Sequence, residues 1–241
     1  MTAAGPVTAF APGGVGNVGP GLDILGLAVE GAGDTVRAEW TREPGIHVRE
    51  SGHPSLPCDP ARHASALAVR AVLSQAGEGL ADGRGIALTV RKGLPLSGGQ
   101  GGSAASAVAG AVAANALLGG PLDRLALLHA CLVAEETVSG RHLDNIAPSL
   151  MGGIVLIRCV HPTDVVALPV PPELMVVLVR PEQQMRTVDG RAVLPATLPL
   201  EVALHQAAQV GALVAALALG DYALLGRAID DRIAEPARAG L

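Results

Sequence analysis

The sequence predicts a folded α+β protein. Over 241 residues, 49% are hydrophobic and 16% are charged, which is too apolar for a disordered chain and enough to bury a sizeable core. Short apolar runs of strand length and longer helical segments are mixed without strict alternation. This order favours α+β over a doubly wound α/β sheet.

Five segments have the length and pattern of strands. The second alternates apolar with charged side chains, as a half-buried strand does, and the last two are continuous apolar runs typical of central strands. A glycine-rich loop is expected between the first two strands. The predicted strands are Val7–Ala11, Thr35–Thr41, Ile86–Val90, Ile154–Ile157 and Met175–Val179.

Five segments predict helices. Asp59 before Pro60 is typical of an N-cap with proline at the first helical position, and the helix that follows should end near Gly77. Pro121 is expected to open another helix, in which leucines at helical spacing mark one face. The predicted helices are Ala64–Ala76, Ser103–Leu118, the helix opened by Pro121, Val202–Leu219 and Tyr222–Ile229.

Composition excludes several classes of protein. A net charge of −5 and only three aromatic residues argue against a nucleic-acid partner and against an anionic membrane surface. Residues 93–122 carry no charge, but alanine, glycine and serine make them a weak membrane span, so a loop and a largely buried helix are the better interpretation. The cysteines are widely spaced, and the first ten residues do not resemble a signal peptide, so a cytoplasmic location is expected.

The densest glycine cluster lies between a predicted strand and a predicted helix. It reads LPLSGGQGGSAA from Leu94 to Ala105. Glycines let backbone amides approach an anion closely, and the helix N-terminus adds unpaired N–H groups and a favourable dipole. A phosphate cradle or a flexible connector would both fit. No lysine follows the glycines, so the pattern is not that of a P-loop, and the spacing is not that of a dinucleotide fingerprint.

Three segments carry a resemblance to a known family. The run PLSGGQGGSAAS resembles the second motif of the GHMP kinases. APGGVGNVGPGLDILGLAVE, from Ala11, and AEETVSGRHLDNIAPSLMGGIVLIR, from Ala134, are similar to segments of homoserine kinases. Later pieces agree, with Thr187, Arg191 and the run DRIAEPAR, so the resemblance spans nearly the whole chain from Val7.

The resemblance implies a two-layer GHMP kinase fold. An N-terminal ATP-binding domain like ribosomal protein S5 is expected over 1–150, and a ferredoxin-like C-terminal domain, apparently incomplete, over 151–241. It further implies that ATP and Mg²⁺ are bound, with Ser103 and Glu135 near the metal ion. The residues implied to hold the ATP phosphates are Pro95, Leu96, Ser97, Gly98, Gly99, Gln100, Gly101, Gly102, Ser103, Ala104 and Ala105.

The resemblance also implies the acceptor. It is L-homoserine, whose hydroxyl would be phosphorylated to O-phospho-L-homoserine for threonine synthesis. Asn145 and Thr187 match positions close to the transferred group, and Asn145 in place of an aspartate implies catalysis without a strong side-chain base. Residues implied to bind the acceptor are Asn17, Asp23, His142, Asp144, Asn145, Arg191 and Arg238. Guanidinium groups suit a carboxylate, and an acidic side chain suits an ammonium group.

Some features depart from the family pattern. Gly98, Gln100 and Gly102 stand where serine, leucine and serine are usual, and His63 stands where an asparagine often lies near the nucleotide. The chain stops before a third glycine-rich motif, which predicts exposed apolar surface on Val202–Leu219 and a possible homodimer. A catalytically impaired nucleotide-binding relative, or a GHMP kinase for another small alcohol such as mevalonate, therefore stays open as an alternative.

Overall fold

The computed structural model describes residues 5–77, 83–138, 140–179 and 187–241, with only the backbone described at 187 and 188. Its strands are β1 (Val7–Gly16), β2 (Leu25–Thr41), β3 (Gly45–Glu50), β4 (Gly85–Arg91), β5 (Ile154–Val160) and β6 (Thr163–Leu168). Its helices are α1 (Ala64–Gln75), α2 (Gly102–Leu117), α3 (Arg124–Val138), α4 (Ile146–Met151), α5 (Thr187–Ala192), α6 (Leu200–Leu219), α7 (Tyr222–Ala228) and α8 (Ala234–Arg238).

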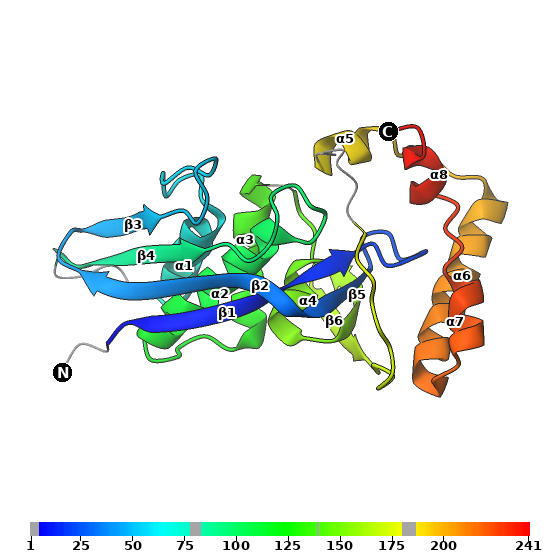
Figure 1. Ribbon diagram of the computed structural model, residues 1–241, viewed down its shortest axis with the longest axis horizontal. Coiled ribbons are helices and arrows are strands. Elements are labelled where there is room, and N and C mark those ends of the chain that lie inside the picture. Colours follow the sequence, from blue (N-terminus) through cyan, green and yellow to red (C-terminus); the bar gives the residue numbers. More distant parts are fainter. Residues whose placement is uncertain (1–4, 78–82, 139, 180–186) are drawn as a thin grey trace.

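The strands form one mixed sheet around the long strand β2 (Figure 1). The order is β3-β4-β2-β5-β6, with β1 also paired to β2. The C-terminal half of β2 pairs with β4 and its first residues pair with β5. Among the strands that the structure describes, only β3 and β4 run parallel to each other. The predicted α+β class is therefore confirmed.

The first two strands are much longer than the sequence predicted. β1 continues to Gly16 and β2 begins at Leu25, so the expected glycine-rich loop shrinks to residues 17–24. The glycines are strand residues here because the backbones pass close together. A Cβ added to Gly14, for example, would lie 2.4 Å from the carbonyl oxygen of Leu27.

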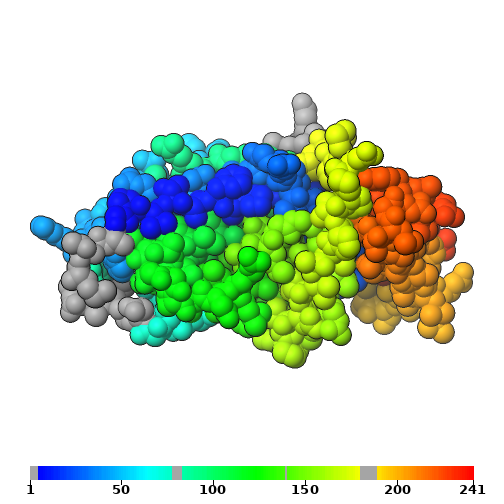
Figure 2. Space-filling view, turned by 90° about the horizontal axis from the view of Figure 1, so that it is seen from below, coloured from blue at the N-terminus to red at the C-terminus, as the bar shows by residue number. Residues whose placement is uncertain are grey.

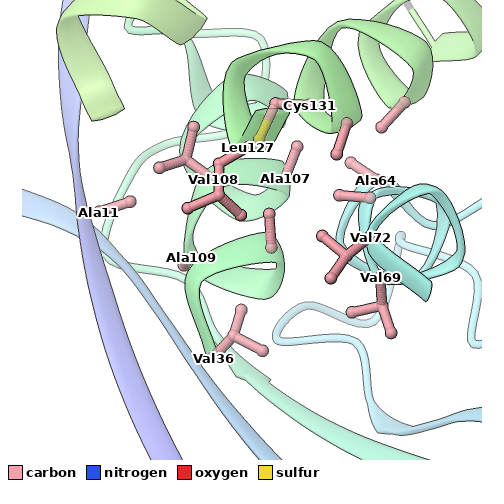
Figure 3. Close-up of a cluster of buried hydrophobic side chains, with 14 of the residues drawn as sticks. Ala11, Val36, Ala64, Val69, Val72, Ala107, Val108, Ala109, Leu127 and Cys131 are labelled. Carbon is pink, nitrogen blue, oxygen red and sulfur yellow. The ribbon is translucent and has the colours of Figure 1, made fainter. Parts of the chain in front are cut away.

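The main core lies between one face of the sheet and helices α1, α2 and α3 (Figure 3). Small side chains of α2, such as Ala107 and Ala109, are fully buried and allow α1, α3 and the sheet to approach α2 closely. As expected, α2 is a helix buried on most sides. The packing fixes the N-terminus of α2 next to the glycine cluster that links it to β4.

One predicted N-cap and one predicted helix start are wrong, whereas α1 begins at Ala64 as predicted. Asp59 forms a turn, and the N-cap of α1 is His63, whose Nδ1 accepts a hydrogen bond from the backbone N–H of Ser65 at 3.3 Å. The third helix begins at Arg124 rather than Pro121, because the Asp123 side chain accepts from the N–H of Ala126 at 2.8 Å. In both cases a side chain nearer the helix supplies the cap.

The segment Met175–Val179 is not a strand, which corrects the prediction. These residues have no regular structure and their side chains are exposed, Met175 by 85% and Val179 by 86%. A continuous apolar run is stable as a central strand only between neighbouring strands, and none of the described strands pairs with it.

The C-terminal helices lie at one end of the molecule (Figures 1 and 2). Leu213 and Leu217 of α6 form a smaller core with Leu25 and Leu27 of β2 and Ile154 of β5. The remaining face of α6 is largely exposed, including Leu200, Leu204 and Leu219, as expected for this helix. By length and composition alone, α6 is the one described helix that could cross a bilayer.

The sequence predicted a division of the chain into two domains at residue 150. Strands β5 and β6, which follow residue 150, pair into the same sheet as the strands before it. Residues 1–150 and 151–241 thus stay a predicted pair of domains that share one sheet.

Candidate active site

A cleft of about 770 Å³ lies beside the glycine cluster, which follows the C-terminal end of β4. Its walls come from the end of β1, the loop before α1, the glycine cluster, the end of α3, the start of α4, and helices α5 and α8. The volume is typical of a small-molecule site. Segments from almost the whole chain therefore meet at one place.

The glycine cluster forms one wall of the cleft. Ser97, Gly99 and Gly101 have φ angles of 52°, 69° and 62°, the left-handed region in which glycine is favoured. Gly101 is the N-cap of α2 and supplies no side-chain cap, so the first amides of this 16-residue helix are free to meet a ligand. Of the predicted phosphate-binding residues, 95–103 line the cleft, whereas the side chains of Ala104 and Ala105 are buried in the core.

Ser103 and Glu135 meet at this wall, although they are 32 residues apart in the sequence. The Ser103 hydroxyl donates to Glu135 Oε1 at 2.9 Å, and Glu135 is buried on α3. Glu136, the next residue, is exposed. Two hard oxygen donors beside free amides fit Mg²⁺, which binds few protein ligands together with phosphate oxygens. No cluster of three or more acidic, histidine or cysteine side chains suited to a metal ion occurs among the described residues.

A buried ion pair, which no sequence pattern predicted, lies against the glycine cluster. Lys92 donates to the fully buried Asp34 carboxylate, to the carbonyl oxygen of Gly102 at 2.9 Å and to Ser106 Oγ at 3.0 Å. Ser106 in turn donates to Asp34 at 2.6 Å. One signal was available, because Lys92 is the only lysine in the chain. Its partner, 58 residues away, had no local signal.

The other end of the cleft holds opposite charges. Both terminal nitrogens of Arg191, on α5, donate to the Asp23 carboxylate, with Nη1 at 3.2 Å from Oδ2. His142 Nδ1 lies 3.1 Å from Arg191 Nη2 and 3.5 Å from Asp23 Oδ1. Burial, and then the nearby guanidinium, lower the pKa of His142, so its ring is neutral at pH 7.

Neighbouring residues hold this pair in place. Asn17 Oδ1 accepts from the Asp23 backbone N–H at 3.0 Å, and both residues have positive φ. Arg238, on α8, donates from Nε to the carbonyl oxygen of Gly190 at 2.9 Å, next to Arg191. The structure thus brings together Asn17, Asp23, His142, Arg191 and Arg238.

Asp144 and Asn145 lie between the two ends of the cleft. Asp144 is 1% exposed, and its Oδ1 has no hydrogen-bond partner among the described residues. Burial and the charge of Asp23 raise its pKa to about 6. Asn145 precedes α4 and reaches the glycine cluster, since a Cβ on Gly101 would lie 2.8 Å from Asn145 Oδ1.

Thr187 and His63 are the remaining positions that the sequence singled out. Thr187 is the first residue of α5, but its side chain lies outside the described part of the structure. His63 lines the cleft together with residues 55–57 and Arg62, and burial lowers its pKa. This wall of the cleft was only partly predicted, because the loop 51–62 has no sequence pattern of its own.

Comparisons with known proteins agree with the fold. The model of the GHMP kinases N terminal domain matches residues 63–153. The chain is 39% identical over 98% of its length to a homoserine kinase of Chlorobaculum tepidum, and it covers 75% of that protein. It is 42% identical to a homoserine kinase of Arabidopsis thaliana, of which it covers 65%.

Solved structures give the same answer. A homoserine kinase from Cytophaga hutchinsonii superposes with a TM-score of 0.90 at 36% identity, over 100% of this chain and 76% of that one. The mevalonate kinase of Methanococcus jannaschii, with a TM-score of 0.55 and 12% identity, shares the fold alone.

The family-model match and the solved homoserine kinase structure therefore place this chain in the GHMP kinase class. Within that class, the chain belongs to the homoserine kinase family, and it spans about three quarters of the length of these relatives.

Proposed function

We propose that this chain transfers the γ-phosphoryl group of ATP to the side-chain hydroxyl of L-homoserine, giving O-phospho-L-homoserine. One observation carries the proposal. A single cleft has an amide-rich anion cradle at one end and a carboxylate beside a guanidinium at the other. These are the groups that a triphosphate and a zwitterionic amino acid require.

On the nucleotide side, the backbone amides of the glycine cluster would bind the phosphates. Ser103 and Glu135 would hold Mg²⁺, whose charge neutralises phosphate oxygens when it is bound. The wall formed by residues 55–57, Arg62 and His63 lines the same cleft and is the proposed position of the nucleobase of ATP. Phosphoryl transfer needs mainly alignment and neutralisation of charge, which these residues supply without covalent chemistry.

On the acceptor side, Asp23 and Asp144 would attract the ammonium group, and Arg191 with Arg238 would bind the carboxylate. Asn145, which lies against the glycine cluster, is then placed to hold the hydroxyl toward the phosphates. An amide orients a hydroxyl by hydrogen bonding but cannot take its proton. Asn145, and Thr187 at the start of α5, are the proposed residues next to the reacting atoms.

The setting follows from the same proposal. Homoserine kinase activity belongs to amino-acid biosynthesis, specifically that of threonine, in the cytoplasm. Acidic net charge argues for small-molecule substrates rather than nucleic acid or a membrane surface. The exposed apolar side chains of α6 and of 175–179 favour self-association, and a homodimer is the simplest form.

The test measures ADP release from Mg-ATP with L-homoserine, with mevalonate and with no acceptor. Homoserine-dependent release that is lost in Arg191→Ala supports the proposal. A folded chain that releases ADP equally with and without homoserine, or that prefers mevalonate, contradicts it. Circular dichroism on the same samples confirms that both proteins are folded.

A further inference from the structure

The acceptor end of the cleft contains an ion pair between two groups that a zwitterionic substrate also needs. Arg191 binds the Asp23 carboxylate with both terminal nitrogens, a bidentate arrangement in which each charge neutralises the other. The backbone N–H of Asp23 donates a hydrogen bond to Asn17 Oδ1, and the backbone of Asp23 has a left-handed conformation, so both features fix its position. The two charges therefore satisfy each other when no substrate is bound.

From this geometry we infer that substrate binding is an exchange of ion pairs, and that the exchange makes the site specific for acceptors carrying both an ammonium and a carboxylate group. This inference rests on the proposed function and deepens it. The substrate ammonium takes the place of the guanidinium on Asp23, and the substrate carboxylate takes the place of Asp23 on Arg191. One internal pair is replaced by two new ones, so no charge is left alone.

An acceptor with only one charge cannot complete this exchange. A hydroxy acid such as 4-hydroxybutyrate draws Arg191 away and leaves the Asp23 carboxylate without a cation. The charge of Asp144 lies close enough to Asp23 to raise the Asp144 pKa, so the abandoned carboxylate also faces a second acidic group. The neighbouring His142 does not compensate, because its pKa is lowered and its ring is neutral at pH 7.

An amino alcohol such as 3-aminopropan-1-ol has the opposite defect. It occupies Asp23 and leaves the Arg191 guanidinium without a carboxylate. Leaving a partly buried charge unpaired weakens binding by about tenfold to a hundredfold, and the lower figure applies to Asp23 because it is partly exposed. The internal ion pair thus disfavours binding of compounds that carry only one of the two charged groups of homoserine.

The test compares three acceptors that differ by one group: L-homoserine, 4-hydroxybutyrate and 3-aminopropan-1-ol. Asp23→Asn removes the carboxylate charge without straining the loop, since asparagine tolerates positive φ. In this variant kcat/KM for homoserine falls by about a hundredfold, whereas kcat/KM for 4-hydroxybutyrate rises by about tenfold. Arg191→Gln gives the mirror result, with a gain for 3-aminopropan-1-ol.

The matched control is Asp164→Asn. It breaks another arginine–aspartate pair, with Arg158, which lies outside the cleft on strands β5 and β6. This variant leaves the ranking of the three acceptors unchanged. The inference is overturned if Asp23→Asn lowers the values for homoserine and 4-hydroxybutyrate in parallel, because a role in folding or chemistry alone predicts no gain.

Calorimetric binding of the same three compounds separates this inference from the proposed function. The exchange predicts that Asp23→Asn binds 4-hydroxybutyrate more tightly than the wild type does, whether or not phosphoryl transfer follows. A wild type that shows no homoserine-dependent ADP release contradicts the proposed function. Binding that shows no such gain overturns the inference.

Discussion

Lys92→Met removes the ammonium group beneath the glycine cluster and keeps an unbranched apolar side chain in its place. The variant loses the ion pair with Asp34 and the hydrogen bonds to Gly102 and Ser106. It leaves the fully buried Asp34 carboxylate without a cation. Removing one partner of a buried pair costs about 3–5 kcal/mol. In a chain of this size, 1 kcal/mol lowers Tm by about 2–4 °C, so the expected fall is roughly 6–20 °C.

Thermal unfolding followed by circular dichroism at pH 7 measures this change. The double variant Asp34→Asn/Lys92→Met recovers at least half of the loss, because it leaves no buried charge unpaired. The control Arg158→Met breaks a pair that is exposed on the surface, and it costs less than about 1 kcal/mol. A Lys92→Met protein that melts within about 2 °C of the wild type would refute the reasoning, as would a double variant no more stable than the single one.

The same variant reports on nucleotide binding. Lys92 holds the carbonyl of Gly102, the first residue of α2, so its loss displaces the amides proposed to bind phosphate. We expect KM for ATP to rise by about tenfold while KM for homoserine changes little. A general loss of folding would instead lower kcat and leave both KM values unchanged.

Three further predictions follow from the cleft. Asp144→Asn abolishes most activity but raises the free energy of unfolding at pH 7.5 by about 2 kcal/mol. The pKa of Asp144 is about 6 in the folded protein, above the usual 3.8, so the free energy of unfolding of the wild type falls as pH rises between these two values. In unfolding measured against pH, the difference between wild type and variant vanishes below about pH 4. Ser103→Ala and Glu135→Gln each raise the Mg²⁺ concentration for half-maximal ADP release by about tenfold, in a titration where unchanged values would argue against their role. Gly101→Ala lowers kcat more than Gly99→Ala, since both have positive φ but only the first meets a neighbouring side chain, and equal losses in an ADP-release assay would contradict this.

Much of the architecture is encoded locally. The helices α1, α2, α3, α6 and α7 were predicted to within a few residues because their apolar spacing and their flanking residues are short-range signals. The wrong N-cap of α1 shows the limit of such signals. Asp59 is the favoured residue type for a cap, but His63 caps the helix, and its position depends on tertiary contacts that include a distance of 3.4 Å from its Nε2 to the carbonyl oxygen of Ser51.

The strand predictions were wrong at the segments whose structure depends on pairing with a neighbouring strand. Residues 12–16 were predicted to form a loop because glycine is depleted in strands. They belong to β1, where Gly14 approaches the backbone of β2 more closely than a residue with a Cβ could. The opposite error occurred at Met175–Val179, which has strand composition but no paired strand among the described residues. A strand is defined by its neighbours, and a local pattern does not contain them.

The sequence by itself located the glycine cluster between a strand and a helix, because this pattern is contiguous along the chain. It also determined which residues match the homoserine kinases. Only the tertiary structure decided that Asp23 and Arg191, 168 residues apart, satisfy each other, and that Lys92 is paired with Asp34. Such pairs depend on the path of the chain through the sheet, because ion pairing requires proximity in space and has no period along the sequence.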